Sequence, residues 1–89
     1  SQGAAADMPS TELVEQDLEE GKIDILTLLV RSGLVPSKSE ARRAVQQGGV
    51  SADGEKVTDI HAEFTKEQFA GEGIVLKKGK KSFQRILMK

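Results

Sequence analysis

Residues 36–50 constrain the fold most, because they have the pattern of one capped helix that leads directly into a strand. Ser37 is a suitable N-cap, and Glu40 follows at the spacing of a capping box. The pair Gly48-Gly49 favours the end of the helix, because glycine readily adopts the left-handed conformation found there. We therefore predict a helix over about residues 37–48, followed at once by a strand.

The two sides of this helix differ in chemistry. At about 100° per residue, Ala41, Ala44 and Val45 share one small apolar side that can lie close to a neighbour. The other side carries cations and hydrogen-bonding side chains, namely Lys38, Ser39, Arg42, Arg43 and Gln46. Taken alone, this basic side fits an ordinary solvated helix face equally well.

A second helix is predicted just before the first, over about residues 24–32. Asp24 is a plausible cap, and the apolar residues that follow surround the helix on nearly all sides, which indicates burial. Gly33 favours its end. Only residues 34–36 separate the two helices, so we expect a tightly packed pair.

The second half of the chain has the pattern of strands. Asp53-Gly54 predicts a tight turn between two short strands over residues 50–57. Residues 73–76 and 83–88 predict two further strands around a basic turn, and Thr65-Lys-Glu-Gln68 predicts one helical turn between the hairpins. Helices followed by hairpins predict an α+β fold, with two packed helices against a small, mainly antiparallel sheet.

The charges are segregated along the chain, although the formal net charge is only −1. Residues 1–20 contain six acidic side chains and no Lys or Arg, whereas all 13 basic residues lie in 21–89 with the other eight acids. We predict that residues 1–22 are a flexible acidic linker or tail and that residues 23–89 are the folded domain. The basic excess of that domain favours a polyanionic partner.

Several classes of function find no support. The chain has no cysteine and one histidine, His61, so no metal site, disulfide or catalytic residue is predicted. The stretch 73–81 superficially resembles a phosphate-binding loop, but its spacing is one residue too long and Lys81 replaces the required hydroxyl. No apolar run approaches the roughly 20 residues of a membrane span, so no membrane partner is expected.

A nucleic acid remains the best-supported partner. The basic side of the helix is one cluster of cations, and the turn Lys77, Lys78, Lys80 and Lys81 is a second. If the helix packs by its apolar side, both clusters can face one way and follow a phosphate backbone. Aromatic residues are few, which favours structured RNA read by shape. We expect Phe64 and Phe69 in the core, and Phe83 as the aromatic residue with a chance of touching RNA.

The residues also carry a family resemblance. Several residues resemble a helix–hairpin RNA-binding motif that is shared with small-subunit ribosomal protein four, namely Ser37-Lys38, Ala41-Arg42, Gly48-Gly49-Val50, Asp53-Gly54 and Val57. Longer stretches are similar to the C-terminal domain of bacterial-type tyrosyl-tRNA synthetases: Leu28-Leu29-Val30 through Leu34, residues 37–43, residues 47–50 and residues 74–83. The similarity covers about residues 9–89. Asp53 and Ala52 depart from the usual pattern, which weakens the expectation that the hairpin itself touches RNA.

The resemblance implies a non-catalytic RNA-binding domain of a parent enzyme that attaches tyrosine to tRNA(Tyr) with ATP. No cofactor is expected in this fragment. The implied partner is tRNA(Tyr), gripped at its long variable arm and anticodon side. The parent is expected to be a cytoplasmic homodimer and the isolated domain a monomer. The implied RNA-facing positions are the basic helix side and the lysine turn.

Two alternatives stay open at this point. The same RNA-binding motif occurs in ribosomal, RNA-modification and stress-response proteins, so the parent could be one of these. The chain could also be a protein-interaction module whose cations only keep it soluble. The full-length gene would identify the parent, and binding to tRNA(Tyr), with and without its variable arm, tests the protein-interaction alternative.

Overall fold

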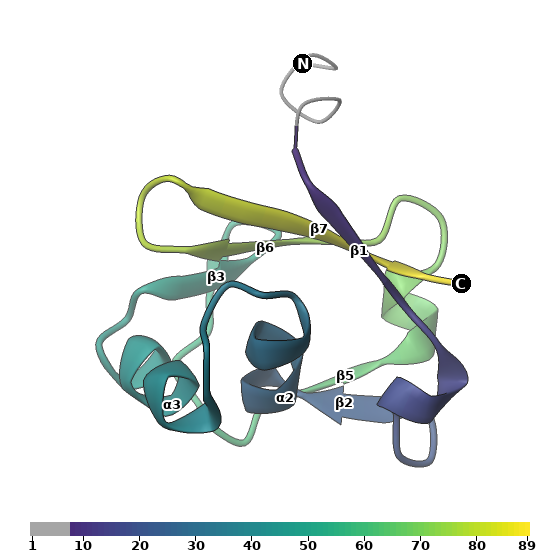
Figure 1. Cartoon of the computed structure of the whole chain (residues 1–89), viewed down its shortest axis with the longest axis horizontal. Coiled ribbons are helices and arrows are strands. Elements are labelled where there is room, and N and C mark those ends of the chain that lie inside the picture. Colours follow the sequence, from purple (N-terminus) through teal and green to yellow (C-terminus); the bar gives the residue numbers. More distant parts are fainter. Residues whose placement is uncertain (1–7) are drawn as a thin grey trace.

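A five-stranded sheet covered on one face by a helix pair makes up most of the computed structural model, which describes residues 8–89 (Figure 1). The strands follow the spatial order β1 (Ser10–Leu13), β7 (Ser82–Met88), β6 (Ile74–Lys78), β3 (Val50–Ala52) and β4 (Glu55–Lys56). All neighbours pair antiparallel except β1 and β7, which are parallel. A separate antiparallel pair joins β2 (Lys22–Asp24) to β5 (Glu63–Thr65). The predicted α+β class with a mainly antiparallel sheet is confirmed.

The helix pair consists of α2 (Ile25–Arg31) and α3 (Lys38–Gln46). Asp24 caps α2 by accepting hydrogen bonds from the backbone N–H of Thr27, at 3.1 Å, and from its hydroxyl, at 2.6 Å. Ser37 caps α3 by accepting from the backbone N–H of Glu40 at 3.3 Å. Both predicted caps are therefore confirmed, and each helix ends slightly before its predicted limit.

Two short 3₁₀ turns complete the chain, η1 (Glu15–Asp17) and η2 (Lys66–Phe69). The second is the helical turn predicted from the Thr65–Gln68 pattern, and the Gln68 side chain accepts a hydrogen bond from the Thr65 backbone N–H at 2.8 Å. The core lies between the sheet and the helices. Phe64 and Phe69 belong to it, as predicted, with ring centroids 6.2 Å apart.

The predicted acidic tail is wrong for residues 10–22. Strand β1 forms an edge of the main sheet, where Leu13 is fully buried, and Leu18 is 8% exposed. Lys89 donates a backbone hydrogen bond to the Leu13 carbonyl at 2.9 Å. The segment folds because β7 supplies backbone partners that its own short sequence cannot supply. Residues 1–7 of the predicted tail lie outside the described residues.

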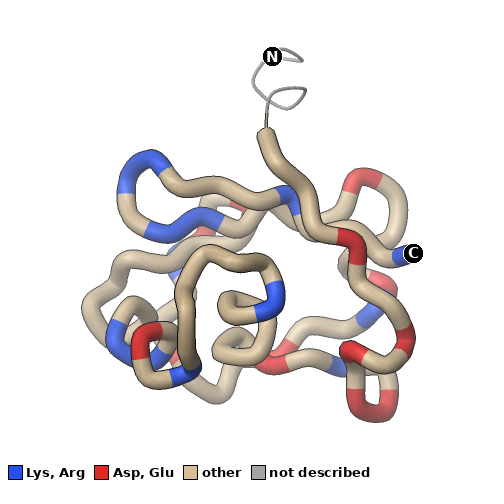
Figure 2. Tube along the Cα trace, in the orientation of Figure 1, with Lys and Arg blue, Asp and Glu red and all other residues tan. Residues whose placement is uncertain are grey.

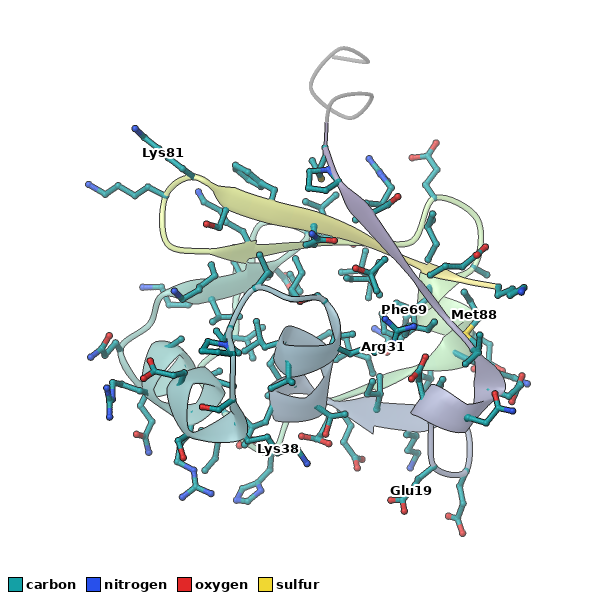
Figure 3. The ribbon with its side chains drawn as sticks, in the orientation of Figure 1. Glu19, Arg31, Lys38, Phe69, Lys81 and Met88 are labelled. Atoms are coloured by element: carbon teal, nitrogen blue, oxygen red, sulfur yellow. The ribbon has the colours of Figure 1, made fainter. Side chains whose placement is uncertain are left out.

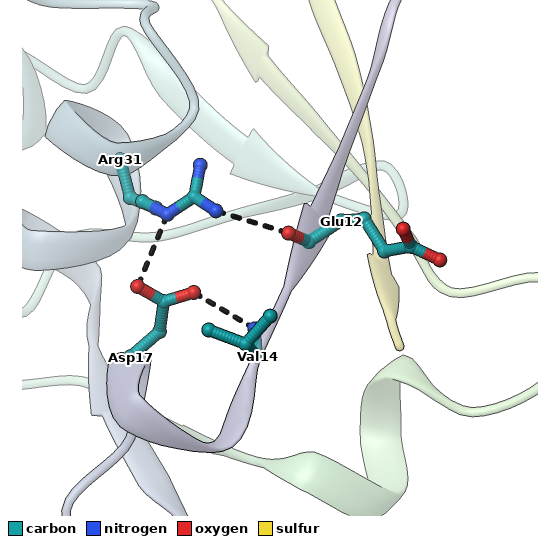
Figure 4. Close-up of polar contacts among 4 residues, drawn as sticks. All are labelled: Glu12, Val14, Asp17 and Arg31. Atoms are coloured by element: carbon teal, nitrogen blue, oxygen red, sulfur yellow. Dashed lines mark hydrogen bonds and ion pairs between the residues drawn. The ribbon is translucent and has the colours of Figure 1, made fainter.

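Charged residues of this segment hold it in place. Arg31, at the end of α2, donates from Nε to Asp17 Oδ1 at 3.1 Å and from Nη2 to the Glu12 carbonyl at 3.0 Å (Figure 4). Asp17 also accepts from the Val14 backbone N–H at 2.8 Å. One arginine thus connects α2 to both β1 and η1. Among residues 8–89, no helix is long and apolar enough to cross a membrane, and no cluster of potential ligands could hold a metal ion.

Candidate nucleic-acid interface

The basic side of α3 is a continuous exposed surface. Ala41, Ala44 and Val45 are buried on its other side, as the sequence pattern predicts. One shallow surface depression of about 370 Å³ is lined by all five predicted helix residues, Lys38, Ser39, Arg42, Arg43 and Gln46. The structure therefore brings this predicted set together on one surface.

Arg43 is the one member of the set with an ion-pair partner in the described chain. Its Nη1 lies 3.6 Å from Glu40 Oε2, one helical turn earlier. Both side chains are well exposed, so the pair is weak and exchanges readily with other partners. Arg43 is thus free to turn toward an anion that approaches the depression.

The loop that leaves α3 connects the helix to the lysine turn. Gly48 has φ = +74°, and the Gly49 N–H donates to the Ala44 carbonyl at 2.9 Å, which completes the helix end. The Gly49 carbonyl then accepts from the Gly79 N–H at 2.7 Å. Gly79 is the centre of the lysine turn. One backbone hydrogen bond therefore fixes the second basic cluster beside the end of the first.

The four lysines of the turn do not all face the same way. Lys78 pairs with the buried Val50, on the face of the sheet that carries the helices, whereas Lys77 pairs with Phe83 on the opposite face. Lys80 and Lys81 are exposed at the tip, where Lys81 extends into solvent (Figure 3). The structure keeps the predicted cluster together but divides it between two faces.

Lys56 is a further cation of this region that the sequence analysis missed. It lies on β4, and its side chain runs beside Gly48 so closely that a Cβ placed on that glycine would lie 3.6 Å from Lys56 Nζ. Its ammonium group thus sits at the exit of α3. The residues next to Lys56 in the sequence do not indicate this contact, because it depends on how the hairpin packs against the end of α3.

Most cations gather at one end of the molecule and most acidic residues at the other, although α3 also carries Glu40 and a few cations lie at the acidic end (Figure 2). The lysine turn and α3 lie at one end, and the acidic residues of β1, η1 and the following turn lie at the other. A phosphate backbone would be attracted to the first end and repelled from the second.

The acidic end contains the larger depression, about 660 Å³, which is lined mainly by carboxylates and bordered by Lys22 and Lys38. Asp24 lies in it. Burial alone raises the pKa of this carboxyl, but the hydrogen bonds from the Thr27 hydroxyl and backbone N–H lower it by more. The net result is a pKa below the usual value of 3.8. The side chain therefore stays ionised, and this depression does not suit an anionic ligand.

The fold and its charge distribution define a small α+β module with a basic helix–hairpin end. The sequence matches the tyrosine-tRNA ligase SYY-like C-terminal domain over residues 1–86, and the chain belongs to this family. It is 44% identical over 89 residues to a tyrosine-tRNA ligase of Clostridium tetani, covering 97% of this chain and 21% of that protein.

Further relatives have the same name. A tyrosine-tRNA ligase of Clostridium botulinum strain Loch Maree is 42% identical over 91% of this chain, and one of Clostridium kluyveri is 40% identical over 92%. The matched regions are 19% and 20% of those proteins, so the chain spans about a fifth of the length of these curated relatives.

Proposed function

We propose that this chain is the tRNA-binding C-terminal domain of a tyrosine-tRNA ligase. The parent enzyme would join tyrosine to tRNA(Tyr) with ATP, in the cytoplasm and as a homodimer, while this non-catalytic part, itself a monomer, would hold the tRNA at its variable arm and anticodon side. Membership of the ligase C-terminal family supports this role. The structural observation that carries it is the Gly79–Gly49 hydrogen bond, which sets the two basic clusters side by side.

The proposed mechanism is electrostatic and depends on shape. Helix α3 is capped at Ser37 and anchored by its buried alanines, so its cations stand at fixed spacings. Arg42 and the lysines at the tip would meet phosphates, and Ser39 and Gln46 would donate hydrogen bonds to sugar or phosphate oxygens. About four to six such contacts would give a slope of log K against log salt of about −3 to −5.

The test is a titration of the chain with tRNA(Tyr) at several salt concentrations. Each phosphate-contacting cation contributes about 0.5–1 kcal/mol at a solvated surface, so the double variant Lys80→Ala/Lys81→Ala should weaken binding about 5- to 30-fold. It should also make the salt slope shallower by about two. Arg42→Ala should weaken binding about 2- to 5-fold.

The matched control is Lys22→Ala/Lys89→Ala, which removes the same charge from exposed positions away from the basic end. This control should change the affinity much less than the variant at the turn does. Equal losses in the two double variants would mean that only net charge matters, and the proposed surface would be wrong. A tRNA(Tyr) without its variable arm should bind more weakly. Absence of binding to either RNA at low salt would favour a protein-interaction module.

A further inference from the structure

The sheet has one face that no helix covers in the described part of the chain (Figure 1). Alternation along the strands assigns the side chains to the two faces: Ile74, Leu76 and Ile86 are buried against the core, so their neighbours point outward. The outward set near the turn consists of Ser51, Lys77 and Phe83, which are cross-strand neighbours on β3, β6 and β7.

Phe83 is unusual in this position. Among residues 8–89 it is the only large apolar side chain classed as exposed, at 36% of its surface. The Lys77 ammonium lies 5.4 Å from its ring centroid, within the range of a cation–π contact. A partly exposed aromatic ring thus has the Lys77 ammonium over it and is preceded in the chain by the exposed lysines of the tip.

We propose that this outward face is a second RNA contact that receives one unpaired nucleotide, with its base stacked on Phe83 and its phosphate bound by Lys77. The inference rests on the proposed function, since the nucleotide would belong to the RNA held by α3 and the turn. It adds a contact of a different kind, because stacking needs an exposed base whereas the helix surface needs only a backbone.

Charge and geometry favour a nucleotide as the occupant. The Lys77 ammonium lies over the ring, and Lys80 and Lys81 are exposed three and two residues before Phe83 in the chain. This local excess of positive charge attracts an anionic strand and disfavours a cationic partner. A base offers a flat π-face to the ring, and its phosphate offers a counter-charge to the ammonium group. Stacking of one base on an aromatic side chain is worth about 1–3 kcal/mol, enough to change affinity about 5- to 150-fold.

The decisive variants are Phe83→Leu and Phe83→Tyr in the full 89-residue chain. Leucine keeps apolar contact with the aliphatic part of Lys77 but cannot stack, whereas tyrosine keeps the ring. We expect Phe83→Leu to weaken binding to tRNA(Tyr) about 5- to 150-fold with an unchanged salt slope, and Phe83→Tyr to bind like the original chain. The control Leu87→Ala removes an apolar side chain from the same face, beside β1, and should leave the affinity unchanged.

A second measurement observes the stack directly. A single-stranded hexaribonucleotide with one central 2-aminopurine should lose fluorescence on binding to the original chain and to Phe83→Tyr, but not on binding to Phe83→Leu. Thermal unfolding of each variant verifies that the fold is retained, which is expected for an exposed side chain.

The outcomes separate the two proposals. Loss of binding in Lys80→Ala/Lys81→Ala with normal binding in Phe83→Leu would keep the proposed function and overturn the stacking site. Equal weakening by leucine and tyrosine would also overturn it, because the ring would then not be the feature that matters. If the unmodified chain binds no RNA at low salt, the proposed function itself fails.

Discussion

Truncating Leu13 to alanine tests whether the N-terminal segment is part of the fold. Leu13 is fully buried, so its loss removes apolar contacts and leaves a cavity under the sheet. Substitutions of this kind cost about 2–5 kcal/mol. Because β1 is an edge strand that can partly relax, we expect a value near the middle, about 3 kcal/mol. A domain of this size has about 4–13 kcal/mol in total, so this is a large fraction of its stability.

The assay is urea unfolding followed by circular dichroism. With an m-value of about 1–2 kcal/mol/M, Leu13→Ala should lower the midpoint by about 2 M. The matched control is the neighbouring Glu12→Ala, because the Glu12 side chain is exposed and only its backbone carbonyl contacts Arg31. That variant should stay within about 0.5 kcal/mol of the original chain. If both variants unfold like the original chain, residues 10–13 are a dispensable tail and the reasoning is refuted.

Two further predictions concern backbone and charge. Gly73→Ala should destabilise the domain by more than about 3 kcal/mol, because Gly73 has φ = +73° and an added Cβ would collide with the Ile86 carbonyl oxygen. The control Gly71→Ala, with φ = +71° and open space around the added Cβ, should cost about 1 kcal/mol. Equal loss of thermal stability in the two variants would contradict this. Asp24→Ala should cost about 1 kcal/mol at pH 7 through loss of the cap. Because the folded-state pKa of Asp24 is lowered, its charge stabilises the fold above about pH 3.8, and this contribution is lost as pH falls through the folded pKa. The difference in free energy of unfolding between the original chain and Asp24→Ala should therefore be smaller in urea unfolding at pH 2.5 than at pH 7.

The helices and the tight turns could be predicted because their signals are local. Asp24 and Ser37 each cap a helix within three residues of their own position, and the Asp53-Gly54 turn joins strands only two residues apart. Such contacts depend on neighbouring residues, which the sequence places side by side. The basic side of α3 follows from the same periodicity as its buried side, so the five residues that line one depression could be grouped from the sequence.

Strand β1 could not be predicted from its own residues. Only Leu13 of its four residues is buried, and its partner β7 lies some 75 positions away in the chain. Its acidic neighbours also suggested a solvated tail, although Asp17 pairs with Arg31, which also donates to the Glu12 carbonyl and so connects the segment to α2. The division of the lysine turn between two faces was missed for a related reason, since it depends on pairing with β3.

The contact between Gly49 and Gly79 explains why both glycine-containing turns matter to one surface. Each turn alone ends its own element, α3 in one case and β6 in the other. Their 2.7 Å hydrogen bond joins them, so the backbone of one turn cannot move away from the other without breaking it. The backbone of a surface fixed in this way loses little conformational entropy on binding, so the main cost is the ordering of its Lys and Arg side chains, and the surface favours ligands whose phosphates already have the matching spacing. Structured RNA meets that requirement better than a flexible polyanion, whose phosphates would have to be ordered on binding.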